Sequence, residues 1–334
     1  MLKLLARCAV ISVVLISASA AEPVKLKLAF PSSDRSTSYL AAVRPFVDAV
    51  NTEARGLIEI ETYFSGVLGK DPAEQPQLVL DGTADIAYVV TGLTRNRFAD
   101  NAIIEMPGLF TSMRESVAVF TRLVAANALQ GFDDYTVIGA YVTEPETIHS
   151  KIPITSLNDL KGKRIRVNNP GEAAALEKLG AQPVFLAVTK ISEAIGNGSI
   201  DGALVPPSPL VDYGIKRVAT YHYLLGISGA PLMVLMNRKT FDRLPELAQA
   251  IILKYSGEWA AARFMDTYEA VENSIMRELK SDPKRQVIMP SSSDLDAANA
   301  VFAAIANDWA SKSERNAELL KTVRTELTKM RSTR

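Results

Sequence analysis

Residues 156–167 read SLNDLKGKRIRV. The segment from Ser156 to Lys161 is typical of a short helical turn, and Gly162 ends it because glycine accepts the left-handed backbone found after helices. Residues 163–167 then predict a strand, which leads through an Asn-Asn-Pro-Gly sequence into a helix that ends near residue 179. A strand followed directly by a helix is the repeating unit of α/β proteins.

The chain before this stretch shows the same alternation of strands and helices. Residues 24–30 and 58–64 alternate apolar and polar side chains, as half-buried strands do. Between them, apolar residues from position 40 to position 50 recur at helical spacing. Two further strands are expected at 86–90 and 136–142, and helices at 73–80 and 116–129. The first half therefore predicts a βαβ opening and a largely parallel sheet.

The second half continues the pattern and predicts a second lobe. Strands are expected at 183–186, 200–205, 221–225 and 232–236, with helices at 191–195, from 244 through Phe264 without interruption, and at 295–330. A chain of 334 residues is long enough for two domains, and no flexible Gly/Ser linker separates them. We expect lobe I to comprise residues 22–143 plus about 231–273, and lobe II residues 144–230 plus about 274–334.

The N-terminus has the features of a secretory signal peptide. Lys3 and Arg7 precede an apolar run over residues 8–16, and Ala18-Ser19-Ala20 supplies a small-x-small cleavage pattern. The run is too short to span a bilayer, and no later segment is long and apolar enough to do so. We expect residues 1–21 to be removed on export, together with the only cysteine, Cys8. The exported chain would then have no disulfide and no thiol nucleophile.

Composition argues against several classes of function. The 37 basic and 37 acidic residues cancel, which gives no electrostatic reason for binding nucleic acid. The only histidines are His149 and His222, and no G-x-S-x-G, H-E-x-x-H or glycine-rich phosphate loop is present. We therefore expect no catalytic residues, no metal site and no cofactor. An exported two-lobed α/β chain of this kind is typical of a binding protein whose cleft closes on a small ligand.

Residues 156–167 also resemble a signature of the solute-binding proteins of TRAP transporters, the DctP type. Four other regions of the chain agree with that family in order and spacing: 56–60 with 66–69, 80–86, 197–202, and 236–237 with 241–245. The resemblance implies a two-lobed periplasmic-binding-protein fold, with strands and a long helix that cross between the lobes. It also implies a periplasmic subunit, not an enzyme, that delivers a small organic acid to the small and large membrane subunits of an ion-driven transporter.

The resemblance also assigns a ligand contact. The resemblance implies that the last arginine of the signature, Arg166, contacts a ligand carboxylate. A guanidinium can bind a carboxylate through two parallel hydrogen bonds. Arg164 lies on the same strand face and is the rival candidate. The alternative interpretation is that either arginine forms an ordinary structural salt bridge.

Three positions depart from the relatives that bind sialic acid. Glu146 stands near their second arginine, Val188 near a cleft phenylalanine, and Val205 near a polar asparagine. These changes predict a less polar acid, with an aromatic wall supplied by Phe185, Tyr141 or Tyr213. Ser33 and Thr91 are further candidates, because they follow the carboxyl ends of strands, where ligands of open α/β sheets bind.

Other functions remain open at this point. The chain could be the binding component of an ABC importer, or an exported subunit that reports a ligand to a membrane kinase. A periplasmic enzyme is a third alternative, although it would have to act without cysteine, clustered histidines or a phosphate loop.

Overall fold

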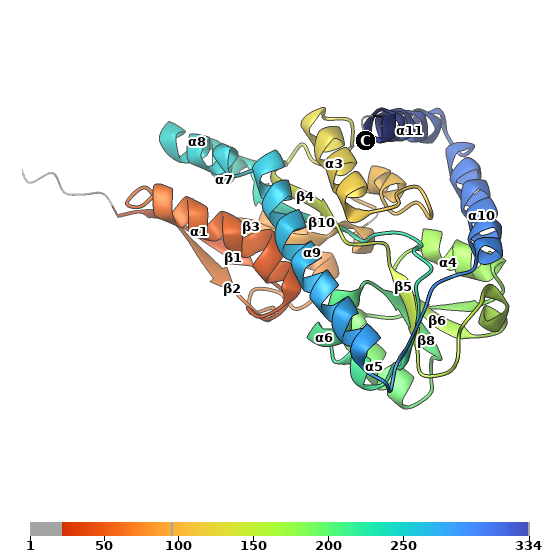
Figure 1. The fold of residues 1–334 in the computed structure, drawn as a ribbon. Helices are drawn as coiled ribbons and strands as arrows, with labels where there is room; N and C mark the ends of the chain where they lie inside the picture. The colour runs from red at the N-terminus through yellow and green to blue at the C-terminus, as the bar shows by residue number, and fades with distance from the viewer. Residues whose placement is uncertain (1–21, 95, 333–334) are drawn as a thin grey trace, which may run out of the picture.

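The computed structural model describes residues 22–94 and 96–332, so the expected signal peptide over residues 1–21 lies outside the described chain. The chain forms two lobes, each built around one sheet (Figure 1). We call lobe I the part around a five-stranded sheet of order β2-β1-β3-β10-β4, and lobe II the part around a six-stranded sheet of order β11-β9-β5-β8-β6-β7.

Lobe I opens with the expected βαβ unit. Its strands are β1 (Val24–Ala29), β2 (Ile58–Tyr63), β3 (Ile86–Val90), β4 (Tyr135–Val142) and β10 (Pro231–Asn237). Strands β1, β2 and β3 pair in parallel, whereas β10 runs antiparallel to both β3 and β4. The alternation read from the sequence buries Leu26 and Leu28 and leaves Lys25 and Lys27 exposed. The other elements of this lobe are η1 (Tyr39–Val43), α1 (Arg44–Glu53), η2 (Pro72–Glu74), α2 (Gln75–Leu80), η3 (Thr91–Leu93), η4 (Ala99–Ile103), α3 (Met113–Ala125), α7 (Arg238–Asp242) and α8 (Glu246–Lys254).

Lobe II has shorter strands and an equally mixed sheet. Its strands are β5 (Thr147–Ser150), β6 (Arg164–Val167), β7 (Gln182–Phe185), β8 (Gly202–Val205), β9 (Tyr221–Tyr223) and β11 (Gln286–Ile288). The central strand β6 pairs in parallel with β7 on one side and β8 on the other. The expected turn before β6 is η5 (Leu157–Leu160), and the helix after it is α4 (Pro170–Lys178). The remaining elements are η6 (Val188–Lys190), α5 (Ile191–Gly196), α6 (Pro207–Asp212) and η7 (Ile215–Arg217).

Two extended segments cross side by side between the lobes. Residues 143–146 lead from β4 to β5, and residues 227–230 lead toward β10. Their backbones are hydrogen-bonded to each other at both ends, from Thr143 N to Ala230 O (3.1 Å) and from Glu146 N to Ser228 O (2.8 Å). We call these two segments the hinge ribbon. At Gly229 a Cβ atom would lie 2.6 Å from Thr143 O, so only glycine permits this close pairing.

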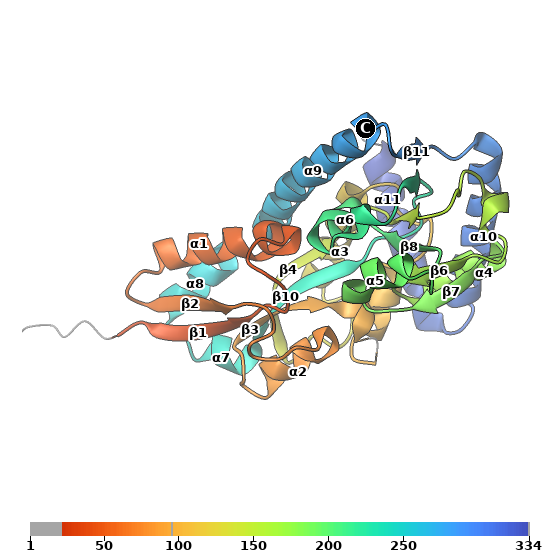
Figure 2. The same cartoon turned by 90° about the horizontal axis from the view of Figure 1, so that it is seen from below.

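The helix α9 (Glu258–Ser281) also joins the two lobes. It contacts η1, α3 and β4 of lobe I and then α6 and β11 of lobe II. Figures 1 and 2 show it running across the molecule from one sheet to the other. Its buried face carries Phe264, which stacks on Tyr141 with ring centroids 4.6 Å apart, and Tyr268. The connection between the lobes is therefore discontinuous in sequence, as expected.

The last two helices, α10 (Ser292–Ala310) and α11 (Glu314–Ser332), attach differently. Helix α10 contacts α4 of lobe II, whereas α11 contacts α3 and η4 of lobe I (Figure 1). Arg331 of α11 binds both carboxyl oxygens of the buried Glu115 on α3, at 3.0 and 2.8 Å. The expected lobe bounds place all residues after about 273 in lobe II and did not anticipate this packing of α11 on lobe I. The division of the chain into two domains at those bounds stays a prediction.

Several element bounds differ from the sequence-based expectation. The prediction of one uninterrupted helix from residue 244 through Phe264 is wrong. Helix α8 ends at Lys254, and Gly257, with a φ of +58°, separates it from α9. The C-terminal helix is likewise two helices, which break at residues 311–313. Strands β5 and β11 were not expected, because each is only three or four residues long and is defined by its neighbours in the sheet rather than by its own pattern.

The α11–α3 contact gives a prediction for stability. The Arg331 guanidinium, together with hydrogen bonds from Thr111, lowers the pKa of the Glu115 carboxyl to about 2, despite its burial. A folded-state pKa below the unfolded value stabilises the fold above about pH 4, and this contribution is lost as pH falls toward 2. Glu115→Gln should therefore lower the free energy of unfolding by roughly 1–3 kcal/mol at pH 7.

Urea unfolding at pH 7, 5 and 3 measures this difference. It should shrink as the pH falls, because the wild type loses its own ionised carboxyl. Glu326→Gln is the matched control: its carboxyl pairs with Arg122 and Lys329 at the surface, and the cost should stay below about 1 kcal/mol. A difference for Glu115→Gln that does not change with pH would show that the ion pair is not its source.

Candidate functional site

Arg166 is the only candidate arginine that the structure buries. It lies on the central strand β6, is 5% exposed, and its guanidinium is held by neutral groups. Nε donates to Leu186 O (2.9 Å), Nη1 to Leu204 O (3.1 Å) and Nη2 to the side-chain oxygen of Asn168 (3.3 Å). Leu186 follows β7, Leu204 belongs to β8 and Asn168 follows β6, so the sheet itself positions the group.

The positive charge of Arg166 has no direct acidic partner. None of the ion pairs among the described residues involves it, although three buried carboxyls lie in its vicinity. A guanidinium has five N–H donors, and three are used by neutral acceptors. One N–H on each terminal nitrogen therefore has no acceptor within the part of the chain that the structure describes, and a carboxylate is the group that can bind both.

The three carboxyls come from three different parts of the chain. Glu105 follows η4 in lobe I, Glu146 ends the first segment of the hinge ribbon, and Glu172 lies in the first turn of α4 in lobe II; they are 4%, 2% and 0% exposed. Glu105 approaches the backbone closely: a Cβ atom at Gly92 would lie 2.1 Å from its Oε1. We call Arg166 and these three glutamates the buried charge cluster.

The carboxyls Glu172 and Glu146 are bonded very differently. Glu172 accepts hydrogen bonds from the Asn168 N–H (2.8 Å), the Asn169 side-chain amide (2.8 Å) and the Ser228 hydroxyl (2.9 Å). Glu146 Oε2, in contrast, is buried and has no hydrogen-bond partner among the residues that the structure describes. Burial raises the pKa of both groups, and for Glu146 the nearby Glu172 adds to the effect while Arg166 opposes it.

The two lobes also touch across the space between them. Asp212, at the end of α6 in lobe II, accepts hydrogen bonds from the Thr37 N–H (3.0 Å) and hydroxyl (3.3 Å), which lie after β1 in lobe I. Tyr213 lies next to it: burial raises the pKa of Tyr213, whereas Ser32 of lobe I and Arg166 of lobe II both oppose this rise. Tyr213 therefore lies near both lobes and near the buried charge cluster.

Arg164 lies apart from this cluster. Its guanidinium binds both carboxyl oxygens of Asp201, at 3.1 and 3.4 Å, and also donates to Gly198 O (2.8 Å). The Arg164 backbone N–H donates to the same aspartate (2.8 Å). The rival candidate is thus engaged in a structural ion pair at the opposite end of strand β6.

The remaining candidates are scattered. Tyr141 is fully buried in the core of lobe I, where it stacks on Phe264 and its hydroxyl donates to Ala42 O (3.2 Å). Val205 is buried in lobe II, and Val188 is half-buried against the same core. Phe185 is 59% exposed and forms no wall. Thr91 is buried after β3 and Ser33 is exposed after β1, so both follow the carboxyl ends of strands, as expected.

The two histidines form a pair that the sequence did not indicate. His149 on β5 and His222 on β9 are both 0% exposed, and their Nδ1 atoms are 2.8 Å apart. His149 Nε2 lies 3.0 Å from the Thr147 hydroxyl and 3.2 Å from Val205 O, so both ring nitrogens of His149 have polar neighbours. Burial lowers the pKa of both, that of His222 to about 4. The pair is neutral and connects two strands.

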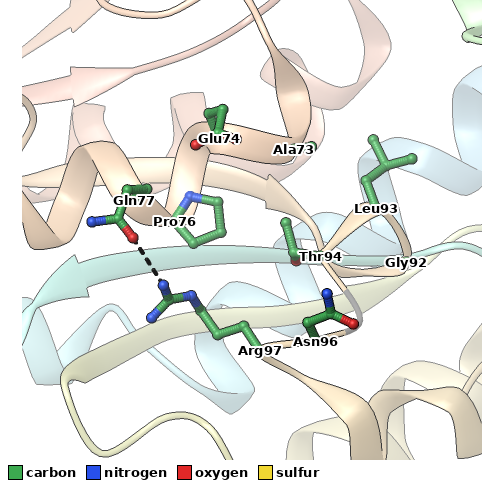
Figure 3. A pocket seen from close by; sticks show the side chains of 9 residues that line it. All are labelled: Ala73, Glu74, Pro76, Gln77, Gly92, Leu93, Thr94, Asn96 and Arg97. Carbon is green, nitrogen blue, oxygen red and sulfur yellow. Dashed lines mark hydrogen bonds between the residues drawn. The ribbon is translucent and has the colours of Figure 1, made fainter.

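A separate pocket lies on lobe I alone. It has a volume of about 650 Å³ and is lined by residues of η2, α2 and η3 and the residues after them (Figure 3). Figure 3 shows Arg97 pointing toward Gln77, and its Nη2 donates to the Gln77 oxygen at 2.9 Å. No residue of lobe II lines this pocket, so a ligand there would not hold the two lobes together.

Within residues 22–94 and 96–332, no group of three or more His, Cys, Asp or Glu side chains is placed to hold a metal ion. In the same part of the chain, no helix has the length and apolar character needed to cross a bilayer.

Comparison with known proteins adds the following findings. The family model for bacterial extracellular solute-binding proteins, family 7 (DctP), matches residues 30–313. A solute-binding protein from Verminephrobacter eiseniae is 26% identical over 212 residues, which span 62% of this chain and 63% of that protein. A TRAP solute-binding protein from a marine metagenome, specific for aromatic acids and crystallised with 3-hydroxybenzoate, superposes with a TM-score of 0.84 at 25% identity, covering 92% of this chain and 99% of that one.

A further solved structure is similar in fold and has another ligand. It is an extracytoplasmic solute receptor from Bordetella pertussis that binds pyroglutamic acid, with a TM-score of 0.78 and 24% identity over 90% of this chain and 99% of that one.

The contact between Asp212 and Thr37 predicts how the lobes respond to mutation. Asp212→Ala removes both acceptors and leaves the buried Thr37 N–H without a partner, so it should favour separation of the lobes by about 1–2 kcal/mol, or roughly tenfold. Small-angle scattering of the unliganded protein should show a larger radius of gyration than the wild type. Asp48→Ala, on the surface of α1, is the control and should leave it unchanged. Equal compaction of all three proteins would exclude Asp212 as a contact that keeps the lobes together.

Proposed function

Since the chain belongs to the bacterial extracellular solute-binding proteins of family 7, the DctP family of TRAP transporters, we propose that it captures a small organic acid in the periplasm. In this proposal residues 1–21 direct export, and the closed protein delivers the acid to the small and large membrane subunits of a TRAP transporter. The chain binds its cargo without transforming it, and no cofactor takes part.

The observation that carries the proposal is the state of Arg166. Its charge is buried, its position is fixed by carbonyls in β8 and directly after β7, and no acid among residues 22–94 and 96–332 forms an ion pair with it. A buried charge without a counter-ion is unfavourable, whereas one that receives a carboxylate through two hydrogen bonds is stabilised. Both ligands named above for similar structures, 3-hydroxybenzoate and pyroglutamic acid, are carboxylic acids.

Closure of the lobes is the second part of the proposal. The hinge ribbon and α9 join the lobes and allow them to move about a few residues. A ligand bound between them favours closure only if it binds the closed state more tightly than the open one. An acid held by Arg166 of lobe II, close to Glu105 and Tyr213, meets this condition, because the lobes approach each other there.

The ligand class is tested by thermal shift against a panel of acids. The panel should include benzoate, 3-hydroxybenzoate, mandelate, pyroglutamate, a 2-keto acid and glucuronate, each with its amide or alcohol as a control. An acid at 100 times its Kd should stabilise the folded protein by about 2.7 kcal/mol, and its uncharged analogue should have no effect. Equal shifts from acid and amide, or none from any acid, would contradict the proposal.

The role of Arg166 is tested with the acid that gives the largest shift. Arg166→Ala should weaken its binding by about 2–5 kcal/mol, or roughly 30-fold to several thousandfold, as measured by calorimetry. Arg166→Lys keeps the charge but loses the planar fork and should also bind more weakly. Arg164→Gln, which removes the ion pair with Asp201 and the hydrogen bond to Gly198 O, is the control and should bind as the wild type does. Unchanged affinity in a folded Arg166→Lys variant would remove Arg166 from the site.

A further inference from the structure

The buried charge cluster contains more acid than base. Glu105, Glu146, Glu172 and Arg166 are each at least 95% buried, and Arg166 is the one cation among them. These are the charged groups that face Glu146: Arg166 from β6, Glu172 from α4 and Glu105 from the segment after η4. If Glu146 and Glu172 were both ionised, an incoming carboxylate would be the third negative charge near the Arg166 guanidinium, in a site of low dielectric. Such a site cannot bind an anion well unless at least one carboxyl is neutral.

The hydrogen bonds identify which carboxyl is the neutral one. Glu172 accepts from three donors, which stabilise its ionised form. Glu146 Oε2 has no hydrogen-bond donor among the described residues, so only the nearby charge of Arg166 favours its ionised form. A proton shared by the cluster therefore resides on Glu146.

The backbone fixes the position of this carboxyl. In the hinge ribbon the Glu146 N–H donates to Ser228 O (2.8 Å), and Glu146 O accepts from the Ile227 N–H (3.0 Å). The same Ser228 donates its hydroxyl to Glu172, so both carboxyls are held on one short segment. Glu146 Oε2 is thus a buried polar atom in a fixed place that requires a partner from outside the protein.

Resting on the proposed function, we propose that Glu146 carries a proton in the folded protein and donates it as an O–H hydrogen bond to an oxygen of the bound acid. Arg166 supplies the one positive charge and Glu146 a neutral donor. A neutral carboxylic acid kept protonated by its surroundings donates a strong hydrogen bond to an anion. The pair selects ligands with a single carboxylate, because the ionised Glu172 nearby would repel a second one.

The consequence is a binding affinity that depends on pH. Once the pH exceeds the pKa of Glu146, the proton must be taken up again on binding, so the affinity should fall by up to tenfold per pH unit. A simple carboxylic acid and an arginine do not titrate between pH 6 and 9, and the buried histidine pair titrates below that range. Burial raises the pKa of Glu272 on α9 to about 8, so this group titrates in the same range, but it remains in a Glu146 variant.

The experiment measures calorimetric affinities at pH 6, 7, 8 and 9 for the wild type, Glu146→Gln and Glu144→Gln. The probe is 3-hydroxybenzoate or pyroglutamate, whichever stabilises the wild type more. Wild-type affinity should fall with pH, whereas Glu146→Gln, a permanent neutral donor, should bind within about tenfold of the wild type at pH 6 and show no dependence on pH. Glu144→Gln alters an acid of the same crossing segment that faces α3 instead, and it should follow the wild type.

Three results would overturn the proposal. Affinity of the wild type that does not change with pH would show that no proton is coupled to binding. The same slope in Glu146→Gln would assign the proton to another group, such as Glu272. Loss of binding by more than 100-fold at every pH in a folded Glu146→Gln variant would show that Glu146 is ionised and accepts a donor or a cation from the ligand.

A measurement without ligand separates this proposal from the function on which it rests. A folded-state pKa above the unfolded value stabilises the protein at low pH, and the contribution is lost as pH rises from about 4 to the folded pKa. The wild type should therefore lose stability relative to Glu146→Gln over that range in urea unfolding. If neither probe binds, the proposed function fails, yet this comparison still decides whether Glu146 holds a proton; a constant difference would show that it does not.

Discussion

The arrangement of this molecule depends on one buried charge, the guanidinium of Arg166, whose hydrogen bonds go to neutral oxygens. Arg166 lies on the central strand of lobe II, and carbonyls of both flanking strands bind its guanidinium. A guanidinium held in this way has a fixed orientation and keeps its positive charge, and its remaining N–H groups can still donate to a ligand. The carboxyls of Glu146 and Glu172 lie near this charge, and among the described residues neither forms an ion pair with it. The protein is thereby prepared for an anion before one arrives.

The same cluster is built where the lobes meet. Glu146 and Ser228 belong to the hinge ribbon, Glu172 to lobe II and Glu105 to lobe I, so one set of hydrogen bonds and charges joins all parts that must move together. Thr37 and Asp212 add a contact across the lobes that does not involve this cluster. Under the proposed function, binding and closure are coupled through these adjacent groups, because a ligand must stabilise one state over the other.

Much of the fold could be predicted from the sequence, and less of the site. Strands such as β3 and β1 carry their own pattern of buried residues, whereas β5 and β11 are short and are defined by pairing with distant strands. The break at Gly257 was missed because the apolar spacing continues across it.

The motif indicated Arg166 as the ligand contact, but strand alternation places Arg164 on the same face and could not exclude it. The two arginines have different partners because only the end of β6 that carries Arg164 lies beside Asp201. Tyr141 is buried and Phe185 is exposed, so the position of an aromatic residue in the sequence does not reveal whether it lies in a core or on the surface. No local signal marked Glu105 or Glu172, because their proximity to Arg166 arises only from the tertiary fold.

The most direct measurement of the central claim is a crystal structure of the wild-type protein grown with the acid that stabilises it most. The account predicts that the two carboxylate oxygens lie about 2.7–2.9 Å from Nη1 and Nη2 of Arg166, with the lobes closed around them. An acid bound instead in the lobe I pocket between Gln77 and Arg97, with the Arg166 guanidinium unoccupied, would contradict it.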